Sequence, residues 1–549
     1  MCVGSAKSSF LVVSRLVAFL MMSAGLATVA SAQTPVTIYN FNLANGNVGA
    51  PKPFDIAVQG RDGNLYSTTN AGGAGNGGVY VVTPAGTETL LHDLPNGSYC
   101  NSGVTLGSDG NFYGACTSLD QNNYGFLYKV TPTGVFTILY SFTNANGDGA
   151  RPQAPPIQAK DGNYYGTTQS GGAYGNGAVY KLTPSGTVAI LYSFTDLVAS
   201  PTAPLVEGTD GNLYGSTPNG GANRVGSIFK ITTAGKLTVL HTFNLTDGGY
   251  PTAALIQGSD GDFYGTTLEG GANNDGVAFK ITASGKFTLL HSFSLATDGN
   301  FSETAMLQAT DGNFYGTTNN TGDYQNIIYK ITPKGVFSIV YQFDGTSATV
   351  GASPANALIQ STNGLLYGAT TFSSSAVPGG SGTIYTLDIG AAPFARLSLT
   401  SGLVGGSVSI FGQGFKGSSV VKFDGVQATG VTRQGTTYII VPVPSGALTG
   451  NVTVTTGSTT LTSNLIFKVT PKVKSFTPSQ GPVGTSVVIK GVSFTQTTKV
   501  TFGSVKTTNF TVDSDTQITA IVPTGAKTGK VVVTTKGGSS SSPTAYIVE

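Results

Sequence analysis

A phrase of eight residues, Asp-Gly-Asn-aromatic-Tyr-Gly-Thr-Thr, occurs seven times in nearly the same form. Its copies begin at Asp62, Asp109, Asp161, Asp210, Asp260, Asp311 and, in degenerate form, Asn363. The spacings between them are 47, 52, 49, 50, 51 and 52 residues. A fixed period near fifty indicates one small structural unit copied in series. A residue that every copy repeats is therefore expected to serve the scaffold rather than a single catalytic site.

Each copy divides into four runs with the composition of strands. In residues 200–243 these runs cover 203–207, 213–216, 227–232 and 237–243. They are rich in β-branched and aromatic residues and are separated by turn residues, a pattern that predicts strands. The Asp-Gly pairs predict hairpin turns, because glycine supplies the positive φ that such turns need. No convincing helical periodicity follows residue 33.

Seven copies of four short antiparallel strands predict an all-β, seven-bladed β-propeller over residues 33–390. The last copy contains its third strand, 383–387, but no fourth. Residues 36–41 match the missing strand, whose form in another copy is 136–142. We therefore expect the N-terminal strand to complete the seventh blade and close the ring, which removes an exposed sheet edge.

The period ends after Asp388, and residues 390–393 have the composition of a linker. Two related units follow, at 391–469 and 470–549. In both, apolar residues alternate with polar ones, and Gly or Pro residues mark the turns. This pattern, over about eighty residues each, predicts two small immunoglobulin-like β-sandwiches.

The first residues have the pattern of a secretory signal peptide. Lys7 and Arg15 precede an apolar run at 16–29, and Ala30-Ser31-Ala32 follows as a small-residue cleavage site. We expect residues 1–32 to be removed near Ala32. The mature chain is then expected to be secreted, periplasmic or on the cell surface, without a transmembrane segment.

Charge is divided unevenly along the chain. Residues 33–390 contain 13 basic and 22 acidic residues, a net charge of −9. Residues 391–549 contain 13 basic and 4 acidic residues, a net charge of +9. The total of zero argues against a nucleic-acid partner. The asymmetry indicates either different partners for the two halves or drift in a solvated surface.

Two cysteines, Cys100 and Cys116, remain after residue 32, and both lie in one repeat. An even pair in an exported chain predicts a disulfide. Two buried free thiols are the alternative. A catalytic role is expected for neither.

The histidines and repeated aspartates do not form a convincing catalytic or metal set. His92, His241 and His291 occupy one repeat position on outer strands of different blades, which diverge. The Asp of each Asp-Gly-Asn is the residue that such turns select, although 260–262 reads Asp-Gly-Asp. The loop 144–149 has some likeness to a calcium loop but lacks its distal Glu. We expect no catalytic residue, no metal and no cofactor.

The loops between second and third strands and the connections between blades are expected on one face. The loops begin with a constant Gly-Gly-Ala, as at 171–173 and 220–222, and then vary. A constant frame with variable tips is how a rigid scaffold presents a binding surface. Aromatic, amide and Arg side chains suit glycans. The candidate ligand-binding residues are Arg151, Tyr174, Asn223, Arg224, Tyr250, Asn273, Asp275, Phe301 and Tyr324. The alternative is a set of ordinary solvent-exposed loops.

The repeat resembles the GloVer tandem repeat of bacterial exported proteins. The resemblance rests on Asp-Gly-Asn-Leu-Tyr-Gly-Ser-Thr at 210–217, Val-Tyr-Lys-Leu-Thr-Pro-Ser-Gly at 179–186 and Leu-Tyr-Ser-Phe at 191–194. It covers roughly 36–388 and implies export and a propeller-like array, but no reaction. A weaker likeness links the phrase to propeller repeats of sensor proteins.

Both C-terminal units resemble IPT/TIG domains. The second has Ser-Phe-Thr-Pro at 475–478 and Gly-Pro-Val-Gly-Thr at 481–485. The first has Leu-Val-Gly-Gly at 403–406, without the Pro, and is therefore similar to a divergent copy. The resemblance implies spacer or adhesive modules.

Three functions are compatible with these observations. The first is a non-catalytic binding or adhesion protein for polysaccharide, a cell-surface protein or another cell-surface component, which it is expected to bind through the loop face near the ring axis. The alternative is a secreted carbohydrate-active enzyme with its site in the central cleft, marked by two non-repeat carboxylates. The third is a structural display protein whose basic C-terminal units rest on an acidic envelope. The ligand, the oligomeric state and any anchor stay open.

Overall fold

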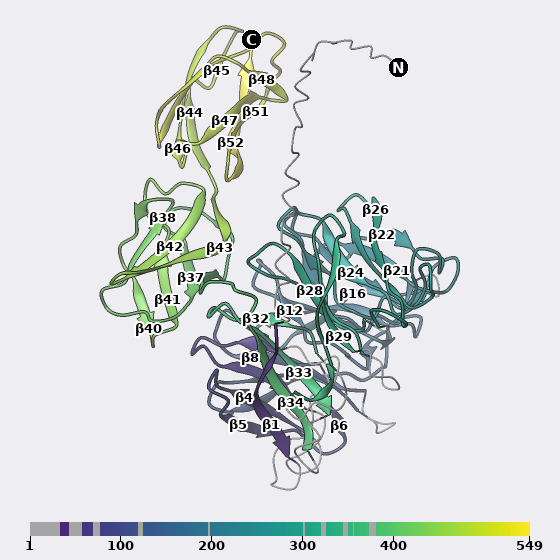
Figure 1. Cartoon of the computed structure of the whole chain (residues 1–549). Coiled ribbons are helices and arrows are strands. Elements are labelled where there is room, and N and C mark those ends of the chain that lie inside the picture. Colours follow the sequence, from purple (N-terminus) through teal and green to yellow (C-terminus); the bar gives the residue numbers. More distant parts are fainter. Residues whose placement is uncertain are drawn as a thin grey trace, which may run out of the picture. The chain divides into compact units, whose positions relative to one another are not determined.

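The structure is a computed structural model that describes residues 33–42, 57–69, 77–100, 102–118, 124–195, 198–299, 302–319, 326–343, 350–354, 356–372 and 380–549. The chain divides into two compact units, Met1–Ala32 and Gln33–Glu549. The first unit, with the predicted signal peptide, lies outside the described residues. In the part that is described, every regular element is a strand (Figure 1). No helix there is long and apolar enough to cross a membrane.

The repeat region is propeller-like. Its described residues form seven antiparallel sheets of at least four strands, one for each copy of the phrase. The first three sheets are β2 (Val58–Gln59), β3 (Leu65–Thr68), β4 (Gly78–Val82), β5 (Glu88–Asp93); β7 (Thr105–Leu106), β8 (Phe112–Ser118), β9 (Phe126–Val130), β10 (Phe136–Ser141), with β6 (Ser98–Tyr99) also on β8; and β12 (Ile157–Gln158), β13 (Tyr164–Thr168), β15 (Ala178–Leu182), β16 (Val188–Ser193).

The other four sheets have the same order. They are β18 (Val206–Glu207), β19 (Leu213–Thr217), β21 (Ser227–Ile231), β22 (Leu237–Thr242); β23 (Ile256–Gln257), β24 (Phe263–Thr266), β25 (Val277–Ile281), β26 (Phe287–Ser292); β27 (Leu307–Gln308), β28 (Phe314–Thr317), β29 (Ile327–Ile331), β30 (Phe337–Gln342); and β32 (Ile359–Gln360), β33 (Leu366–Phe372), β34 (Gly380–Leu387), β1 (Val36–Asn42), with β31 (Ala352–Pro354) also on β33. The innermost strands are shorter than expected: the run at 203–207 shrinks to Val206–Glu207.

The N-terminal strand joins the last sheet. β1 pairs antiparallel with β34, with Val36 opposite Thr386 and a bulge between Thr37 and Tyr39. The outer strands of the other sheets carry the same irregularity, as between Ile138 and Tyr140 in β10. Bulges of this kind disrupt the exposed edge of a sheet and so oppose pairing with another chain.

Hydrogen bonds explain the repeated phrase. In six copies the Tyr hydroxyl donates to the Asp carboxylate four residues earlier, over 2.7 to 2.9 Å. In five of them the Asn between them donates both its backbone N–H and its side-chain amide to that Asp. In the degenerate copy the Asn363 amide donates to the Tyr367 hydroxyl instead. The phrase therefore closes the turn between the first and second strands.

Neighbouring sheets are joined at one further repeat position. A Gln or Glu of the innermost strand accepts an N–H bond from the Asp-Gly turn of the preceding sheet, over 2.7 to 3.3 Å. One of these bonds runs from Thr362 of the last sheet to Gln59 of the first. The core between sheets also contains stacked rings, such as Tyr214 on Phe263 at 3.8 Å.

Two β-sandwiches follow, and their strands pair in the same order. The first consists of β35 (Arg396–Leu397), β37 (Ser407–Phe411), β41 (Tyr438–Pro442), β40 (Thr432–Gln434) and of β36 (Ser401–Gly402), β43 (Thr459–Val469), β42 (Gly450–Thr456), β38 (Val420–Phe423), β39 (Val426–Gln427). The second consists of β44 (Lys472–Thr477), β46 (Ser486–Val492), β50 (Gln517–Ile521), β49 (Phe510–Ser514) and of β45 (Gln480–Gly481), β52 (Gly538–Val548), β51 (Gly529–Thr535), β47 (Thr497–Phe502), β48 (Val505–Thr507). Each sandwich encloses its own apolar core, as immunoglobulin-like folds do.

Candidate functional site

The two loop types that were expected to share one face are hydrogen-bonded to each other. In the third repeat, β11 (Gly149–Ala150) of the connection pairs with β14 (Ser170–Gly171) of the loop. In the fourth repeat, β17 (Val198–Ala199) pairs with β20 (Asn219–Gly220). An isolated bridge joins Gly249 to Glu269 in the fifth. The connections and loops therefore form one continuous surface, here called the loop face.

Four of the connections contain a residue with a left-handed backbone at the same repeat position. Arg151, Ser200, Tyr250 and Ser353 occupy the same repeat position and have φ between 55° and 59°. The Arg151 N–H donates to Tyr124 O of the preceding repeat at 2.7 Å, and its carbonyl accepts from Gln169 N at 3.0 Å. Tyr250 is held in the same way by Val225 and Leu268. These bonds keep the position rigid although left-handed backbone is unfavourable for side-chain-bearing residues.

Three of the predicted ligand-binding residues are exposed and have no side-chain partner among the described residues. They are Arg151, Tyr174 and Arg224. Tyr174 exposes 66% of its surface. Arg224 is itself left-handed, with φ of 60°. These side chains project from a fixed backbone and are available to a ligand.

Four other predicted residues have structural contacts. The Asn223 and Asn273 amides donate to the carbonyls of Phe243 and Phe293, at 3.1 and 2.9 Å. These carbonyls follow the outer strands, so the tips at Asn223 and Asn273 lie toward the periphery of the sheets and not near the ring axis, where the binding residues were expected. Asp275 accepts from Leu295 N at 2.9 Å, and Tyr250 packs partly against an apolar core. The other two predicted residues, Phe301 and Tyr324, lie outside the described residues.

The centre of the loop face, where the alternative enzyme site was expected, contains a depression whose lining residues the sequence analysis did not name. Equivalent positions of five successive repeats line it, which places it where their innermost strands begin. The lining residues are Gln153, Ala154, Pro155, Thr202, Ala203, Pro204, Thr252, Ala253, Ala254, Glu303, Thr304, Ala305 and Ala357. Alanine and proline form most of its wall, and a few polar side chains interrupt them.

Glu303 is the single carboxylate of this lining, and burial raises its pKa. Thr202 and Thr252 have buried hydroxyl oxygens without a partner in the described protein. Gln153 donates its Nε2 to Gln169 Oε1 at 2.9 Å. All four stand eight residues before the Asp of the phrase. The signal that could have found them is this one repeat position, which changes from Gln to Thr to Glu along the chain.

The histidines pack between sheets rather than around a common centre. His92, His241 and His291 stack on Phe136, Phe287 and Phe337 of the next repeat, with ring centroids 4.5, 4.2 and 3.9 Å apart. His241 also lies 3.1 Å from Asp247, and His291 bonds Asp298. Among the described residues, no three or more His, Cys, Asp and Glu side chains gather into a group that could hold a metal.

The acidic sequences that resembled calcium loops have protein partners. Asp148 of the loop 144–149 accepts from the Tyr140 hydroxyl at 3.1 Å and from Thr143 N at 2.8 Å. In the Asp-Gly-Asp turn, Lys280 lies 3.6 Å from Asp260 and 3.1 Å from Asp262. Asp148 is thus held by hydrogen bonds, and the two aspartates of the 260–262 turn are paired with Lys280.

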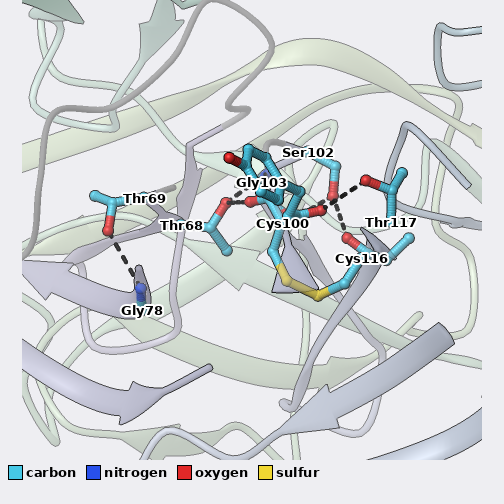
Figure 2. The surroundings of a disulfide bond; sticks show 10 residues. Thr68, Thr69, Gly78, Cys100, Ser102, Gly103, Cys116 and Thr117 are labelled. Atoms are coloured by element: carbon cyan, nitrogen blue, oxygen red, sulfur yellow. Dashed lines mark hydrogen bonds between the residues drawn. A yellow bond between two sulfur atoms is a disulfide. The ribbon is translucent and has the colours of Figure 1, made fainter. Parts of the chain in front are cut away.

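Cys100 and Cys116 form a disulfide with Cα atoms 4.2 Å apart (Figure 2). The bond ties the connection before β7 to β8 of the same sheet. Beside it, the Thr68 hydroxyl of the preceding repeat donates to Cys100 O at 2.7 Å, and Ser102 Oγ donates to Ala115 O at 2.8 Å. The disulfide is therefore part of the loop-face framework.

No curated protein matches this chain. A fungal alcohol oxidase in complex with copper is 11% identical over 94% of this chain and 100% of its own, with a TM-score of 0.46. A surface glycan-binding protein from Prevotella bryantii is 22% identical over 28% of this chain and 41% of its own, with a TM-score of 0.22. An oligogalacturonate lyase from Vibrio parahaemolyticus is 13% identical over 50% and 76%, with a TM-score of 0.35.

Solved structures this distant carry no argument about function. The family matches are more specific. Residues 151–385 match the Gloeobacter/Verrucomicrobia repeat and residues 471–548 match the IPT/TIG domain. The first match lies within 36–388, the span of the resemblance seen in the sequence, and the second covers the second sandwich. The chain thus contains a region of Gloeobacter/Verrucomicrobia repeats at 151–385 and an IPT/TIG domain at 471–548.

Proposed function

We propose that this chain is an exported, non-catalytic binding protein whose loop face holds a glycan or another cell-surface component. The observation that carries the proposal is the combination of a fixed frame and variable tips. The connection backbone has the same left-handed, doubly bonded geometry at Arg151 and Tyr250. On that frame the exposed side chains differ from repeat to repeat.

The chemistry of the tips suits a carbohydrate. The Tyr174 ring can pack against the C–H face of a pyranose, as apolar ring faces do in other binding sites. Arg151 and Arg224 each supply several N–H donors for hydroxyl or carboxylate groups. Because the backbone of these loops is already fixed, little backbone entropy is lost when a ligand binds.

The architecture proposed for this function is a closed ring of seven blades followed by two IPT/TIG-type sandwiches. The pairing of β1 with β34 and the Gln59–Thr362 bond both join the last repeat to the first, which supports closure. The first sandwich has the strand order of the second, which supports a divergent copy. Both serve as spacers or adhesive modules. The disulfide supports an oxidising compartment outside the cytoplasm.

The alternative is a carbohydrate-active enzyme with its site in the central depression. Such enzymes use two carboxylates, about 5 to 9 Å apart. Among the described residues that line the depression, Glu303 is the only carboxylate. Its raised pKa would suit an acid, but a partner carboxylate is required for hydrolysis. Binding is therefore the function that we put forward.

The test is a glycan-array screen of the purified chain. The variant carries R151A, Y174A and R224A together, and its matched control carries K236A, K286A and K334A. These three exposed lysines lie in turns at the opposite ends of the strands. We expect a defined set of glycans to bind the wild type and the control and to lose at least tenfold in signal with the loop variant. An array and a surface-protein pull-down that both give no binding would overturn the proposal.

A further inference from the structure

One link between neighbouring repeats departs from the common pattern. In six pairs of neighbours, counting the last repeat with the first, a Gln or Glu side chain accepts an N–H bond from the preceding Asp-Gly turn. The second repeat has Leu106 at this position, and leucine has no side-chain acceptor. Here the Arg61 guanidinium of the first repeat donates to Ser108 O at 2.6 Å. The side chain of Arg61 therefore replaces the missing link.

The first sandwich also contacts Arg61. The guanidinium lies 4.7 Å from the centre of the Tyr438 ring of β41, which is within the range of a cation–π interaction. The Thr437 hydroxyl donates to Arg61 O at 2.6 Å. Tyr438 is buried, and its hydroxyl donates to Ser409 Oγ at 2.6 Å, which fixes the ring. The sandwich thus holds the side chain that links the first two repeats.

The same sandwich is bonded to the junction of the last repeat with the first, here called the seam. Arg396 of β35 donates Nη2 to Gln59 O at 3.2 Å. Thr362 accepts at its carbonyl from Phe394 N at 3.0 Å and donates its hydroxyl to Gly412 O at 3.3 Å. Gln59 and Thr362 are both buried, and the bond between them joins the last repeat to the first. The sandwich therefore contacts both sides of the seam.

The glycines of the Asp-Gly turns show which turns are covered. At Gly364 of the last repeat, an added Cβ would lie 2.2 Å from Ala391 O of the linker. At Gly63 of the first repeat, it would lie 3.0 Å from Thr437 Cγ2. In the four repeats from the third to the sixth, nothing lies within 4 Å of such a Cβ, at Gly162, Gly211, Gly261 and Gly312. The linker and the first sandwich thus cover the turns at the seam and leave these four open.

We propose that the first sandwich is a clasp, which holds the ring of repeats closed at the seam and fixes the link from the first repeat to the second. The seam exists because the ring closes as proposed above. Residues 33–549 cluster as one compact unit, in agreement with a docked sandwich. Opening of the seam then requires the sandwich to undock. The covered turns lie at the opposite ends of the strands from the loop face, so the clasp leaves the loop face accessible.

Hydrogen exchange of the full chain, followed by mass spectrometry, tests the clasp. R396M and T437V together remove the donors to Gln59 O and Arg61 O. We expect exchange at 57–69 and 356–372 to become about tenfold faster, because local opening loses the bonds that oppose it. Exchange at 203–217, in the fourth repeat, should change less than about threefold. Slow exchange in β42 shows that the sandwich stays folded.

The matched control carries K422M and T453V. These residues face each other on β38 and β42, in the other sheet of the same sandwich, and no hydrogen bond or ion pair joins them to the described part of the repeats. The control should exchange at the seam as the wild type does.

A second pair of variants tests the clasp without removing a hydrogen bond. Gly364→Ala places a Cβ against Ala391 O, whereas Gly261→Ala places one in open space. The two glycines have φ of 91° and 89°, so the backbone strain is the same. We expect only Gly364→Ala to speed exchange at 57–69 and 356–372.

Seam exchange as slow as in the wild type, in both the R396M and T437V variant and Gly364→Ala, would overturn the clasp. So would an acceleration that is equal in all repeats, because the contacts would then stabilise no particular junction. Neither result would affect the proposed glycan binding, which the glycan array tests separately on the loop face.

Discussion

The glycine that follows the tyrosine of the phrase is explained by a ring on the third strand. At Gly166 and Gly316 an added Cβ would collide with the hydroxyls of Tyr180 and Tyr329, and at Gly215 it would lie 2.7 Å from the Phe229 ring. None of these glycines has a positive φ. In these copies glycine serves close approach of the ring and not backbone freedom, whereas the first copy has Ser67 at this position.

Gly215→Ala tests this explanation. We expect it to lower the free energy of unfolding by about 1–3 kcal/mol, because the Phe229 ring must shift in a filled core. The matched control is Gly417→Ala, where nothing lies within 4 Å of the added Cβ. Urea unfolding measures both. Equal stability of the two variants would show that the ring does not determine the residue.

The turn aspartates predict a sensitivity to acid. Burial pushes the pKa of Asp109, Asp161 and Asp210 upward, but hydrogen bonds from the following Asn and Tyr and a nearby Lys outweigh it, so that each pKa is lowered. A lowered folded-state pKa contributes stability above the ordinary Asp value of about 3.9, which is lost as pH falls further.

The melting temperature should therefore fall between pH 5 and pH 3. A variant with D109N, D161N and D210N should fold, because the seventh copy has Asn363 at this position. It should show a flatter profile over the same pH range. Differential scanning calorimetry at several pH values measures this, and identical slopes for both proteins would contradict the assignment.

At the scale of the element, the connections between sheets are held by two different means. Pro152, Pro201, Pro251 and Pro354 stand nine residues before the phrase, where the second repeat has Cys100. Proline restricts the backbone of this segment, and the disulfide to Cys116 restricts it through β8. The cysteine pair thus replaces a proline in keeping one connection in place.

Replacing both cysteines by serine is expected to lower the free energy of unfolding by about 2–4 kcal/mol, because the bond closes a loop with a sequence separation of 16 residues. Urea unfolding without reductant compares the variant with the wild type. The wild type in dithiothreitol is the control and should unfold like the variant. A loss below 0.5 kcal/mol would mean that the surrounding hydrogen bonds hold the connection without the disulfide.

The strands were largely predictable because turn residues and β-branched runs mark them locally. In the fourth repeat, the outer strand expected at 237–243 is found as Leu237–Thr242. The innermost strand was overestimated, because Ala203 and Leu205 look like strand residues but precede the short β18. Ala203 lines the central depression, and Leu205 is buried in the core between sheets. Composition does not distinguish residues buried in these places from residues paired in a strand.

At the scale of the whole molecule, the site was less predictable than the fold. Exposed tips such as Tyr174 follow from loop composition. The hydrogen bonds from the Asn223 and Asn273 amides to the ends of the outer strands could not be predicted from loop composition. The carbonyls that accept them lie twenty residues later in the sequence. Glu303 becomes notable only when five repeats bring equivalent residues to one depression, and this convergence depends on the arrangement of all the sheets.

The opposite net charges of the two regions offer a competing explanation for any binding. Exposed lysines such as Lys472, Lys474 and Lys490 have no ion-pair partner among the described residues, and they could attract anionic polymers without using the repeats. Binding through these charges would weaken steeply with salt, because screening shortens their range to about 3 Å at 1 M. Binding by aromatic and hydrogen-bonding contacts on the loop face would depend much less on the salt concentration.

The most direct test therefore measures the affinity for an array-selected glycan by surface plasmon resonance at 50 and 500 mM NaCl. The wild type is compared with the R151A, Y174A and R224A variant and with a K472A, K474A and K490A variant. If the loop face binds, the loop variant loses at least tenfold in affinity, while salt and the lysine variant change it less than threefold. Affinity that survives in the loop variant but disappears with salt or with the lysines would contradict the account.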